Sequence, residues 1–416
     1  MIEYDYVIIG AGIIGLTIAY ELIQQFPVAT IAIIEKENEV AQHASGRNSG
    51  VVHAGFYYSK DSLKAKLTVR GNELMRKFCQ EHSLPLKNWQ KIVVAKNAEE
   101  VKGLEELYQR GVTNGATVEL IDENQLKKIY PNIKTYQKAL FSPNTASVDP
   151  KAVCYKLKDL LAEQKVNFIF DEKVKKIKNN FIQTTTKTIF YKYLFNCAGL
   201  YADKLAQQLG LAKHYVLLPF KGLYLKSLKN EENVETNVYP VPNLNNPFLG
   251  IHFTKTVKGD IKIGPTAIPA FWRENYKGLD NFKLKELLEV VYYQLKLWIQ
   301  NSFNFRRLAL NEIKNYSSRV MLAEAKKLVY ELNDEARYMA AGIRAQLLDT
   351  KKNQLIMDFV IEQTENSTHV LNAISPAFTC SFAFAKYVLQ QIKVTPSMGD
   401  QRHIDQPALL SAVEIL

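Results

Sequence analysis

Cysteine is scarce in this chain of 416 residues, and the four cysteines that it has are scattered. Cys79, Cys154, Cys197 and Cys380 lie far apart, and no two of them form a C-x-x-C pair. This spacing argues against a disulfide framework and against a cysteine-ligated metal site. We therefore expect a reducing compartment and no bound metal.

Long uncharged runs are also absent. The two longest, Tyr6–Tyr20 and Val370–Phe384, are shorter than the roughly 20 apolar residues that a membrane-spanning helix needs. A strand is predicted to begin at Tyr4, which leaves no room for a signal or transit segment before it. We expect a cytoplasmic protein, with peripheral contact to the inner face of a membrane as the open alternative.

Blocks of basic residues are missing, although the formal net charge is +11 at pH 7. A basic surface attracts anionic lipid, acidic substrates or nucleic acid. Nucleic-acid recognition would need a clustered basic stripe, and the lysines here are spread along the chain. We therefore expect no nucleic-acid partner.

Apolar residues are plentiful, at 47% of the chain, which suffices for a large core and two domains. The apolar pattern predicts a strand over Tyr4–Ile9, a helix over Ile13–Gln25 and a second strand over Thr30–Ile34. Both strands are continuous apolar runs, which is typical of a parallel sheet buried on both faces. The start of the chain is therefore predicted to be a β-α-β unit.

Further elements are predicted along the rest of the chain. The predicted helices are Ser62–His82, Ala98–Arg110 (ended by Gly111), Asp149–Gln164, Asn281–Ile299, Leu322–Leu332 and Phe378–Ile392. The predicted strands are Trp89–Ala95, Val166–Phe170, Tyr193–Asn196, Tyr215–Leu225, Val238–Pro242, Phe248–Ile263, Tyr338–Ala341 and Leu355–Glu362. Alternation between residues 215 and 263 predicts an antiparallel sheet in a second domain.

The sequence Gly10-Ala11-Gly12-Ile13-Ile14-Gly15 is a G-x-G-x-x-G motif between the first strand and the first helix. This context predicts a dinucleotide site, because the glycines permit a tight turn and close approach of a diphosphate to the helix N-terminus. Glu35 ends the second strand about 20 residues later, where an acidic residue holds a ribose.

The motif alone does not separate FAD from NAD. The chain has no second G-x-G-x-x-G, and a run of small and polar residues, 44–50, follows Glu35. Such a run can contact a second phosphate and a ribityl chain, which favours non-covalently bound FAD. Near the other end, Ser375 is predicted to cap the last helix with Pro376 at its first position, and this positive helix end would stabilise a reduced flavin ring.

Four segments make the chain resemble a known family. They are Ser45–Tyr58, Pro247–Thr254, Gly342–Gln346 and Leu371–Ala377. Over essentially its whole length the chain is similar to the L-2-hydroxyglutarate oxidase/dehydrogenase family, among the D-amino-acid-oxidase-like flavoproteins. It departs from the usual family pattern at a few positions: Arg47 (usually His), Lys221 (Arg), Leu223 (Glu), Lys255 (Arg) and Thr266 (Asn).

The resemblance implies a fold and a set of cofactor contacts. We predict an α/β protein with a discontinuous Rossmann-like FAD-binding domain built from residues 1–85, 145–213 and 335–416. Residues 86–144 and 214–334 would form an inserted α+β substrate domain on a mixed, largely antiparallel sheet. The candidate FAD contacts are Gly10, Gly12, Ile14, Gly15, Glu35, Lys36, Ser45, Asn48, Ser49, Gly50, Val174, Ala198, Gly199, Gly342, Arg344, Pro376 and Ala377.

The resemblance also implies oxidation of an L-2-hydroxy acid, L-2-hydroxyglutarate, to 2-oxoglutarate by hydride transfer to flavin N5. A base that titrates near neutrality would take the hydroxyl proton, which points to His53 or His252, with His53 slightly ahead. Lys221 and Arg344 are candidates to bind the substrate carboxylates, although Arg344 fits a flavin contact equally well. Tyr58, or its neighbour Tyr57, would add a hydroxyl.

Two alternatives stay open beside this hypothesis. One is an amine oxidase of the glycine, sarcosine or D-amino-acid type, which would share the FAD domain. A distant one is an RNA-modifying flavoprotein, suggested by the basic charge alone. The electron acceptor, oxygen or a membrane quinone, does not follow from the residues.

Overall fold

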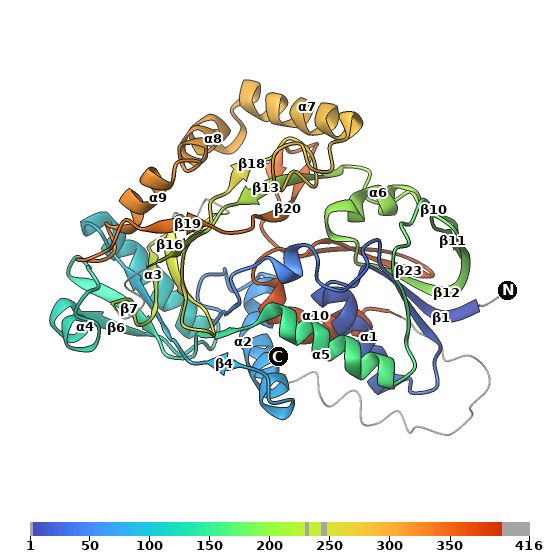
Figure 1. Ribbon diagram of the computed structural model, residues 1–416, viewed down its shortest axis with the longest axis horizontal. Coiled ribbons are helices and arrows are strands. Elements are labelled where there is room, and N and C mark those ends of the chain that lie inside the picture. Colours follow the sequence, from blue (N-terminus) through green and yellow to red (C-terminus); the bar gives the residue numbers. More distant parts are fainter. Residues whose placement is uncertain (1–2, 229–232, 243–247, 393–416) are drawn as a thin grey trace.

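A computed structural model of the chain describes residues 3–228, 233–242 and 248–392. Its strands form two large sheets that lie side by side, with long helices on the outside (Figure 1). The helices are α1 (Ile13–Gln25), α2 (Leu63–Glu81), α3 (Ala98–Thr113), α4 (Glu123–Ile129), α5 (Pro150–Glu163), α6 (Ala202–Gln207), α7 (Leu284–Gln300), α8 (Phe305–Lys314), α9 (Ser318–Ala325) and α10 (Ala377–Gln390).

The first large sheet has a parallel centre in the order β23-β12-β1-β2-β9. The antiparallel strands β11 and β22 pair with β12 and β23, and β10 pairs with β11. The strands are β1 (Glu3–Ile9), β2 (Ile31–Ile34), β9 (Asn167–Ile169), β10 (Lys176–Ile177), β11 (Phe181–Gln183), β12 (Thr188–Asn196), β22 (Val360–Thr364) and β23 (Ser367–Asn372). The predicted β-α-β start is confirmed.

This sheet is buried on both faces, as its continuous apolar strands predict. On one face Ile8 and Ile33 pack with α1, α2, α5 and α10. On the other face Val7 and Ile9 pack with the β10–β11 hairpin and α6. Asp149 caps α5 with its side chain, and Pro150 takes the first helical position, as predicted.

The second large sheet, in the order β19-β14-β17-β16-β15-β5-β7-β6, is antiparallel except where β15 meets β5. A four-stranded sheet, β18-β13-β20-β21, and a three-stranded sheet, β3-β8-β4, join it to the first. The strands are β3 (Val51–Val52), β4 (Leu86–Lys87), β5 (Lys91–Val94), β6 (Glu119–Asp122), β7 (Lys138–Ser142), β8 (Ala146–Val148), β13 (Tyr215–Gly222), β14 (Leu225–Ser227), β15 (Asn237–Pro240), β16 (His252–Lys255), β17 (Ile261–Gly264), β18 (Ile268–Pro269), β19 (Ala336–Tyr338), β20 (Gly342–Asp349) and β21 (Gln354–Leu355). The predicted mixed, largely antiparallel second sheet is confirmed.

Several sequence predictions about elements are wrong. The strand predicted over Phe248–Ile263 is two strands, β16 and β17. The helix predicted over Leu322–Leu332 lies earlier, as α9, and α8 was not predicted. Gly111 does not end α3 but lies inside it. A Cβ at this position would approach side-chain atoms of Val118 and Phe56 to within 3 Å. This glycine is needed for close packing.

The division into two domains stays a prediction, and the strand pairing bears on its boundary at residue 335. β19 and β20 follow residue 335 but pair with β14 and β13, outside the parallel sheet. The chain returns to the parallel sheet only at β22 and β23. The predicted ranges also include residues 1–2 and 393–416, which lie outside the described residues, as does Pro247.

Candidate active site

A cavity of about 600 Å³ extends from the carboxyl ends of β1, β2 and β12 to strands β15, β16 and β20. Ligands of open parallel sheets bind at the carboxyl ends of their strands. Most predicted site residues line this cavity: Gly10, Gly12, Ile14, Glu35, Lys36, Ser45, Asn48, Ser49, His53, Val174, Ala198, Gly199, His252, Gly342, Arg344, Pro376 and Ala377. One cavity therefore joins the predicted cofactor contacts to the predicted base and cation.

The glycine loop has the backbone geometry that a diphosphate site needs. Gly10 has φ +102°, and a Cβ there would lie 2.5 Å from the carbonyl oxygen of Cys197. A Cβ at Gly15 would lie 2.0 Å from the carbonyl oxygen of Gly10, so this glycine lets α1 pack on β1 without lining the cavity. The N-cap of α1 is Gly12, which has no side chain to bond the first-turn N–H groups, although Ser45 Oγ accepts from Ile13 N–H at 2.9 Å.

Glu35 lies at the end of β2 and holds this loop in place. One carboxylate oxygen accepts from Ala11 N–H at 2.8 Å, and the other accepts from Glu37 N–H at 3.0 Å. An ionised carboxylate has about four lone-pair positions, so capacity remains for hydroxyl groups in the cavity. This arrangement fits the predicted ribose contact.

The opposite end of the cavity meets the N-terminus of α10. The prediction that Ser375 caps this helix is wrong, since the helix begins at Ala377 and Pro376 occupies the N-cap position without a side-chain bond. Ser375, Pro376, Ala377 and Thr379 all line the cavity. The positive end of α10 therefore faces the cavity, as expected, although its cap differs.

His53 follows β3 and is buried against two helices. Its N–H donates to Thr379 Oγ1 at 3.1 Å, and its carbonyl oxygen accepts from Asn72 Nδ2 at 2.9 Å. Its Nδ1 is buried with no hydrogen-bond partner among the described residues. Burial lowers the pKa of His53 well below its usual value, and the nearby Lys91 and His252 lower it further. The ring is therefore neutral at neutral pH.

His252 begins β16 and has a defined tautomer. Its Nδ1 lies 2.8 Å from the carbonyl oxygen of Gly250 and must donate, since a carbonyl only accepts. Nε2 therefore carries the lone pair of the neutral ring. The ring stacks on Tyr239 with centroids 3.7 Å apart. Burial, more than any other cause, lowers the pKa of His252 to about 3.

Arg344 supplies a cation to the wall of the cavity near these histidines. It lies on β20 opposite Phe220 of β13, and its guanidinium lies 5.0 Å from the ring centroid of Phe248. Burial lowers the pKa of this guanidinium, while Tyr224 and Glu312 act in the opposite direction. An arginine stays charged under such conditions, so the cavity contains a fixed positive charge.

Four predicted site residues do not line the cavity. Lys221 lies next to Phe220 on β13, and its Nζ donates instead to Asn275 Oδ1 at 3.3 Å. Lys221 therefore lies outside the lining, since neighbouring side chains of a strand point to opposite faces, and its predicted substrate contact stays a prediction. Tyr58 and the motif glycine Gly15 are also outside the lining, as is Gly50, where a Cβ would lie 2.5 Å from the carbonyl oxygen of Val148.

Sequence reasoning missed the aromatic wall of the cavity. Tyr201, Tyr224, Tyr239 and Phe248 line it, together with Thr266. Of these, only Thr266 stands out in the sequence, as a departure from the family pattern. Tyr239 lies within a strand predicted from its apolar pattern, so its identity suggested core packing.

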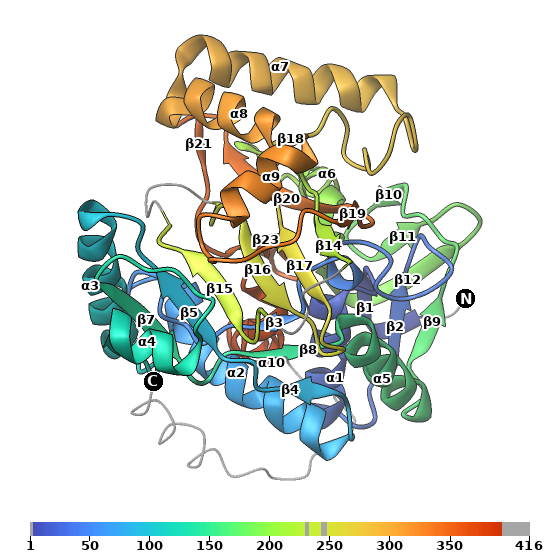
Figure 2. The ribbon, with the colours of Figure 1, turned by 60° about the vertical axis from the view of Figure 1, so that its left-hand side comes forward.

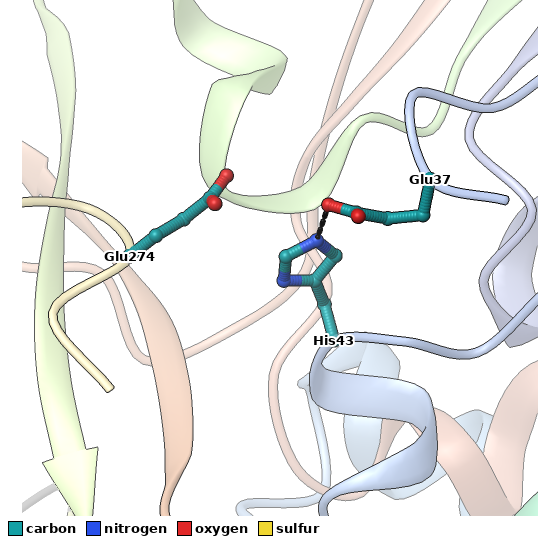
Figure 3. Close-up of side chains that lie close together, drawn as sticks. All are labelled: Glu37, His43 and Glu274. Atoms are coloured by element: carbon teal, nitrogen blue, oxygen red, sulfur yellow. Dashed lines mark hydrogen bonds and ion pairs between the residues drawn. The ribbon is translucent and has the colours of Figure 1, made fainter. Parts of the chain in front are cut away.

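At the cofactor end of the wall, Glu37, His43 and Glu274 lie close together (Figure 3). His43 Nε2 lies 2.8 Å from Glu37 Oε1, and its Nδ1 lies 2.7 Å from the Tyr276 hydroxyl. Lys36 forms ion pairs with both glutamates, at 2.9 Å to Glu274. Because both carboxylates are already paired with Lys36, we interpret the cluster as a brace between the loop after β2 and residues 274–276.

The chain is similar in sequence to known proteins. The family model described as "FAD dependent oxidoreductase" matches residues 5–391. The chain is 36% identical over 413 residues to the mitochondrial L-2-hydroxyglutarate dehydrogenase of Caenorhabditis briggsae, covering 94% of this chain and 93% of that protein. It is 35% identical to the L-2-hydroxyglutarate dehydrogenase of Indibacter alkaliphilus, covering 93% and 98%, and 33% identical to that of Escherichia coli K12, covering 94% and 93%.

Solved structures agree on the fold. L-alpha-glycerophosphate oxidase from Mycoplasma pneumoniae with FAD bound superposes with a TM-score of 0.75 at 22% identity, covering 95% of this chain and 96% of that one. Glycine oxidase from Geobacillus kaustophilus has a TM-score of 0.70 at 17% identity, covering 97% and 100%. The predicted fold class, cofactor and family are confirmed. The protein is an FAD-dependent oxidoreductase, and its chain belongs to the FAD dependent oxidoreductase family and, within it, to the family of the L-2-hydroxyglutarate dehydrogenases.

Proposed function

We propose that this enzyme oxidises L-2-hydroxyglutarate, or a close L-2-hydroxy dicarboxylate, to the 2-oxo acid. The observation that carries the proposal is one cavity in which the FAD loop, two neutral histidines and Arg344 meet. A hydroxy acid needs a proton acceptor for its hydroxyl group and a cation for its carboxylate, and these residues supply both. The activity named for the similar dehydrogenases supports the same substrate class.

The residues of the cavity fit FAD at several points. The loop at Gly10 and the N-terminus of α1 suit the diphosphate, Glu35 suits a ribose, and the positive end of α10 suits the flavin ring. Bound FAD would supply the two-electron acceptor of the reaction. The protein's own part is to hold the substrate, take its hydroxyl proton and exclude water.

We assign the proton acceptor to His53, with His252 as the alternative. His53 has a buried ring nitrogen without a partner among the described residues, and His252 presents a lone pair at Nε2. The two rings are neutral and ready to accept a proton. A substrate carboxylate held by Arg344 brings negative charge into the cavity and raises the pKa of both rings toward neutrality.

The substrate class is tested by anaerobic bleaching of the flavin. L-2-hydroxyglutarate is expected to bleach it within seconds, and the D-enantiomer is expected to leave it oxidised, since an asymmetric cavity places only one hydrogen toward the flavin. Absorbance in a stopped-flow instrument measures both rates. Faster bleaching by glycine, sarcosine or a D-amino acid would reject the hydroxy-acid assignment in favour of an amine oxidase.

The cofactor contact of Glu35 has its own test. Glu35→Arg is expected to lower the FAD content of the purified protein at least tenfold, because the substitution removes the ribose acceptor and the bonds to Ala11 and Glu37. We expect FAD to be non-covalent, so acid precipitation should release it into the supernatant, where it is quantified by fluorescence. Glu39→Arg, on the same loop, is the matched control. Wild-type FAD content in Glu35→Arg would exclude a ribose contact.

We further propose that the enzyme contacts a membrane surface and passes electrons to a quinone there, with oxygen as the alternative acceptor. No helix of the described residues is long and apolar enough to cross a membrane. α7 lies along the outside of the molecule (Figure 2) and carries an exposed apolar stripe, with Leu288 and Tyr292 each 61% exposed and Ile299 70% exposed. Such a stripe, with Lys285 and Arg306 beside it, suits an anionic bilayer surface.

Sedimentation with lipid vesicles tests the membrane contact. The wild-type enzyme is expected to sediment with vesicles that contain phosphatidylglycerol and much less with pure phosphatidylcholine. The double substitution L288E/I299E should reduce the bound fraction at least fivefold without changing flavin reduction. Equal binding of the wild type and of L288E/I299E would show that α7 does not form the membrane contact. If oxygen reoxidises the reduced flavin faster than a soluble quinone does, quinone is rejected as the acceptor.

A further inference from the structure

Lys91 of β5 is a buried lysine that the chemistry described above does not use. Its side chain has a relative exposure of 0%, and its Nζ has no hydrogen-bond partner among the described residues. Lys91 is paired with Ser142 of β7 and Asn237 of β15, both uncharged. Burial of an ammonium without a carboxylate is costly, and an apolar residue of the same size would fit the site more favourably.

Aromatic rings surround this ammonium. Nζ lies 4.0 Å from the ring centroid of Tyr239, 5.1 Å from that of Tyr57 and 5.6 Å from that of Phe56. The faces of aromatic rings attract cations. Burial raises the pKa of both tyrosines, so these rings are neutral at neutral pH. The rings hold the ammonium in place without neutralising it.

Tyr239 connects this ammonium to His252. The ring of His252 stacks on Tyr239 at 3.7 Å, and Lys91 Nζ lies 4.0 Å from the same centroid. Two groups so close to one centroid cannot share a face, so Lys91 and His252 lie on opposite faces of the tyrosine. The ammonium thus lies one ring away from a histidine that lines the cavity.

The charge of Lys91 reaches both candidate bases. It opposes protonation of His53 and of His252, and Arg344 also opposes protonation of His252. Within the described part of the chain, the charged groups that act on these rings are cations, and no carboxylate is named among them. Burial lowers the pKa of Lys91 itself to about 7. Its charge is therefore present below neutral pH, where a histidine would otherwise become protonated.

We propose that Lys91 is a positioning residue that fixes Tyr239 behind His252 and, through its charge, keeps the base of the reaction in its proton-accepting form. The proposal rests on the proposed function in that a histidine takes the substrate proton. It adds a residue outside the cavity that sets the pH range of the reaction. Lys91 itself does not line the cavity.

The sign of the expected effect follows from the charge. Removal of a positive charge favours the imidazolium form, so the pKa of the histidines rises. A larger fraction of the base is then protonated at a given acidic pH. The acid limb of the rate profile should therefore move to higher pH, by about 0.5 to 2 units for a charge at this separation in a protein of effective dielectric constant near 20.

The test compares FAD-loaded wild type with Lys91→Met, which keeps the length of the side chain and loses its charge. The rate constant of anaerobic flavin reduction is measured from pH 5 to 9 with whichever substrate reduces the wild type. In Lys91→Met, the fall in rate on the acidic side of the profile is expected to occur at higher pH than in the wild type. Lys91→Arg should restore the wild-type limb, and Lys87→Met, at an exposed position of β4, should leave it unchanged. An unshifted limb in Lys91→Met would overturn the proposal.

A second measurement does not depend on turnover. Histidine labelled with ¹³C at Cε1 reports ring protonation by NMR in the FAD-loaded protein with glutarate, a dicarboxylate that lacks the oxidisable hydroxyl group. The signals missing from His53→Gln and His252→Gln identify the two rings. Both midpoints should rise in Lys91→Met, and unchanged midpoints would contradict the proposal. If no substrate reduces the wild type, the proposed function fails while this arm still tests Lys91. Should Lys91→Met not fold, Lys91→Gln takes its place.

Discussion

His53→Ala is expected to lower the rate constant of flavin reduction by a factor of about 10² to 10⁴, the usual loss when a general base is removed. Apparent substrate affinity should change much less, because the imidazole acts on the hydroxyl proton in the transition state. Stopped-flow reduction over a range of L-2-hydroxyglutarate concentrations separates the two parameters.

His252→Ala is the matched comparison, since both rings are buried, neutral and part of the cavity wall. If His53→Ala reduces at a near-native rate while His252→Ala is slow, the base is His252. Near-native rates in both would exclude His53 and His252 as the base. Each variant must be compared at the same flavin content.

Arg344→Gln should raise the apparent dissociation constant of the substrate by a factor of about 30 or more, because loss of one partner of a buried charge pair costs about 2–5 kcal/mol. Arg344→Lys should fall between this variant and the wild type, because lysine keeps the charge and loses the planar two-point contact. The same concentration series gives the constants.

Lys221→Gln serves as the control for Arg344→Gln. Lys221 lies on the paired strand, and its Nζ is bound to Asn275 rather than directed into the cavity. We expect near-native affinity in this variant. A loss of affinity as large as that of Arg344→Gln would place the substrate carboxylate near Lys221 and contradict the role assigned to Arg344.

The cofactor half of the site could be predicted from the sequence because its geometry is local. The turn at Gly10, the packing at Gly15 and the position of Glu35 all follow from one β-α-β unit whose elements are close in sequence. The spacing of these residues fixes their arrangement in space. Such a motif can therefore be located from the order and spacing of its residues alone.

The substrate half could not be predicted to the same degree because it depends on strand register. Whether Lys221 or Phe220 faces the cavity is decided by one residue of β13, and a shift of one residue exchanges the two faces. β20 itself was not predicted, since Arg344 and Gln346 interrupt its apolar pattern. The roles of Tyr239 and Lys91 depend on the pairing of β5 with β15, which are far apart in the sequence.

α10 packs beside α1 and α2 although it comes last among the described helices (Figure 1), and this has a consequence for synthesis on the ribosome. The glycine loop emerges first, but the helix that completes the cavity emerges some tens of seconds later, at about 5–20 residues per second. Until α10 has emerged, the apolar side of α1 lacks this helix to pack against, and the nascent chain lacks the part of the cavity wall formed by the N-terminus of α10. Cofactor loading is therefore a post-translational step, and a chain that ends before Ala377 is expected to bind no FAD.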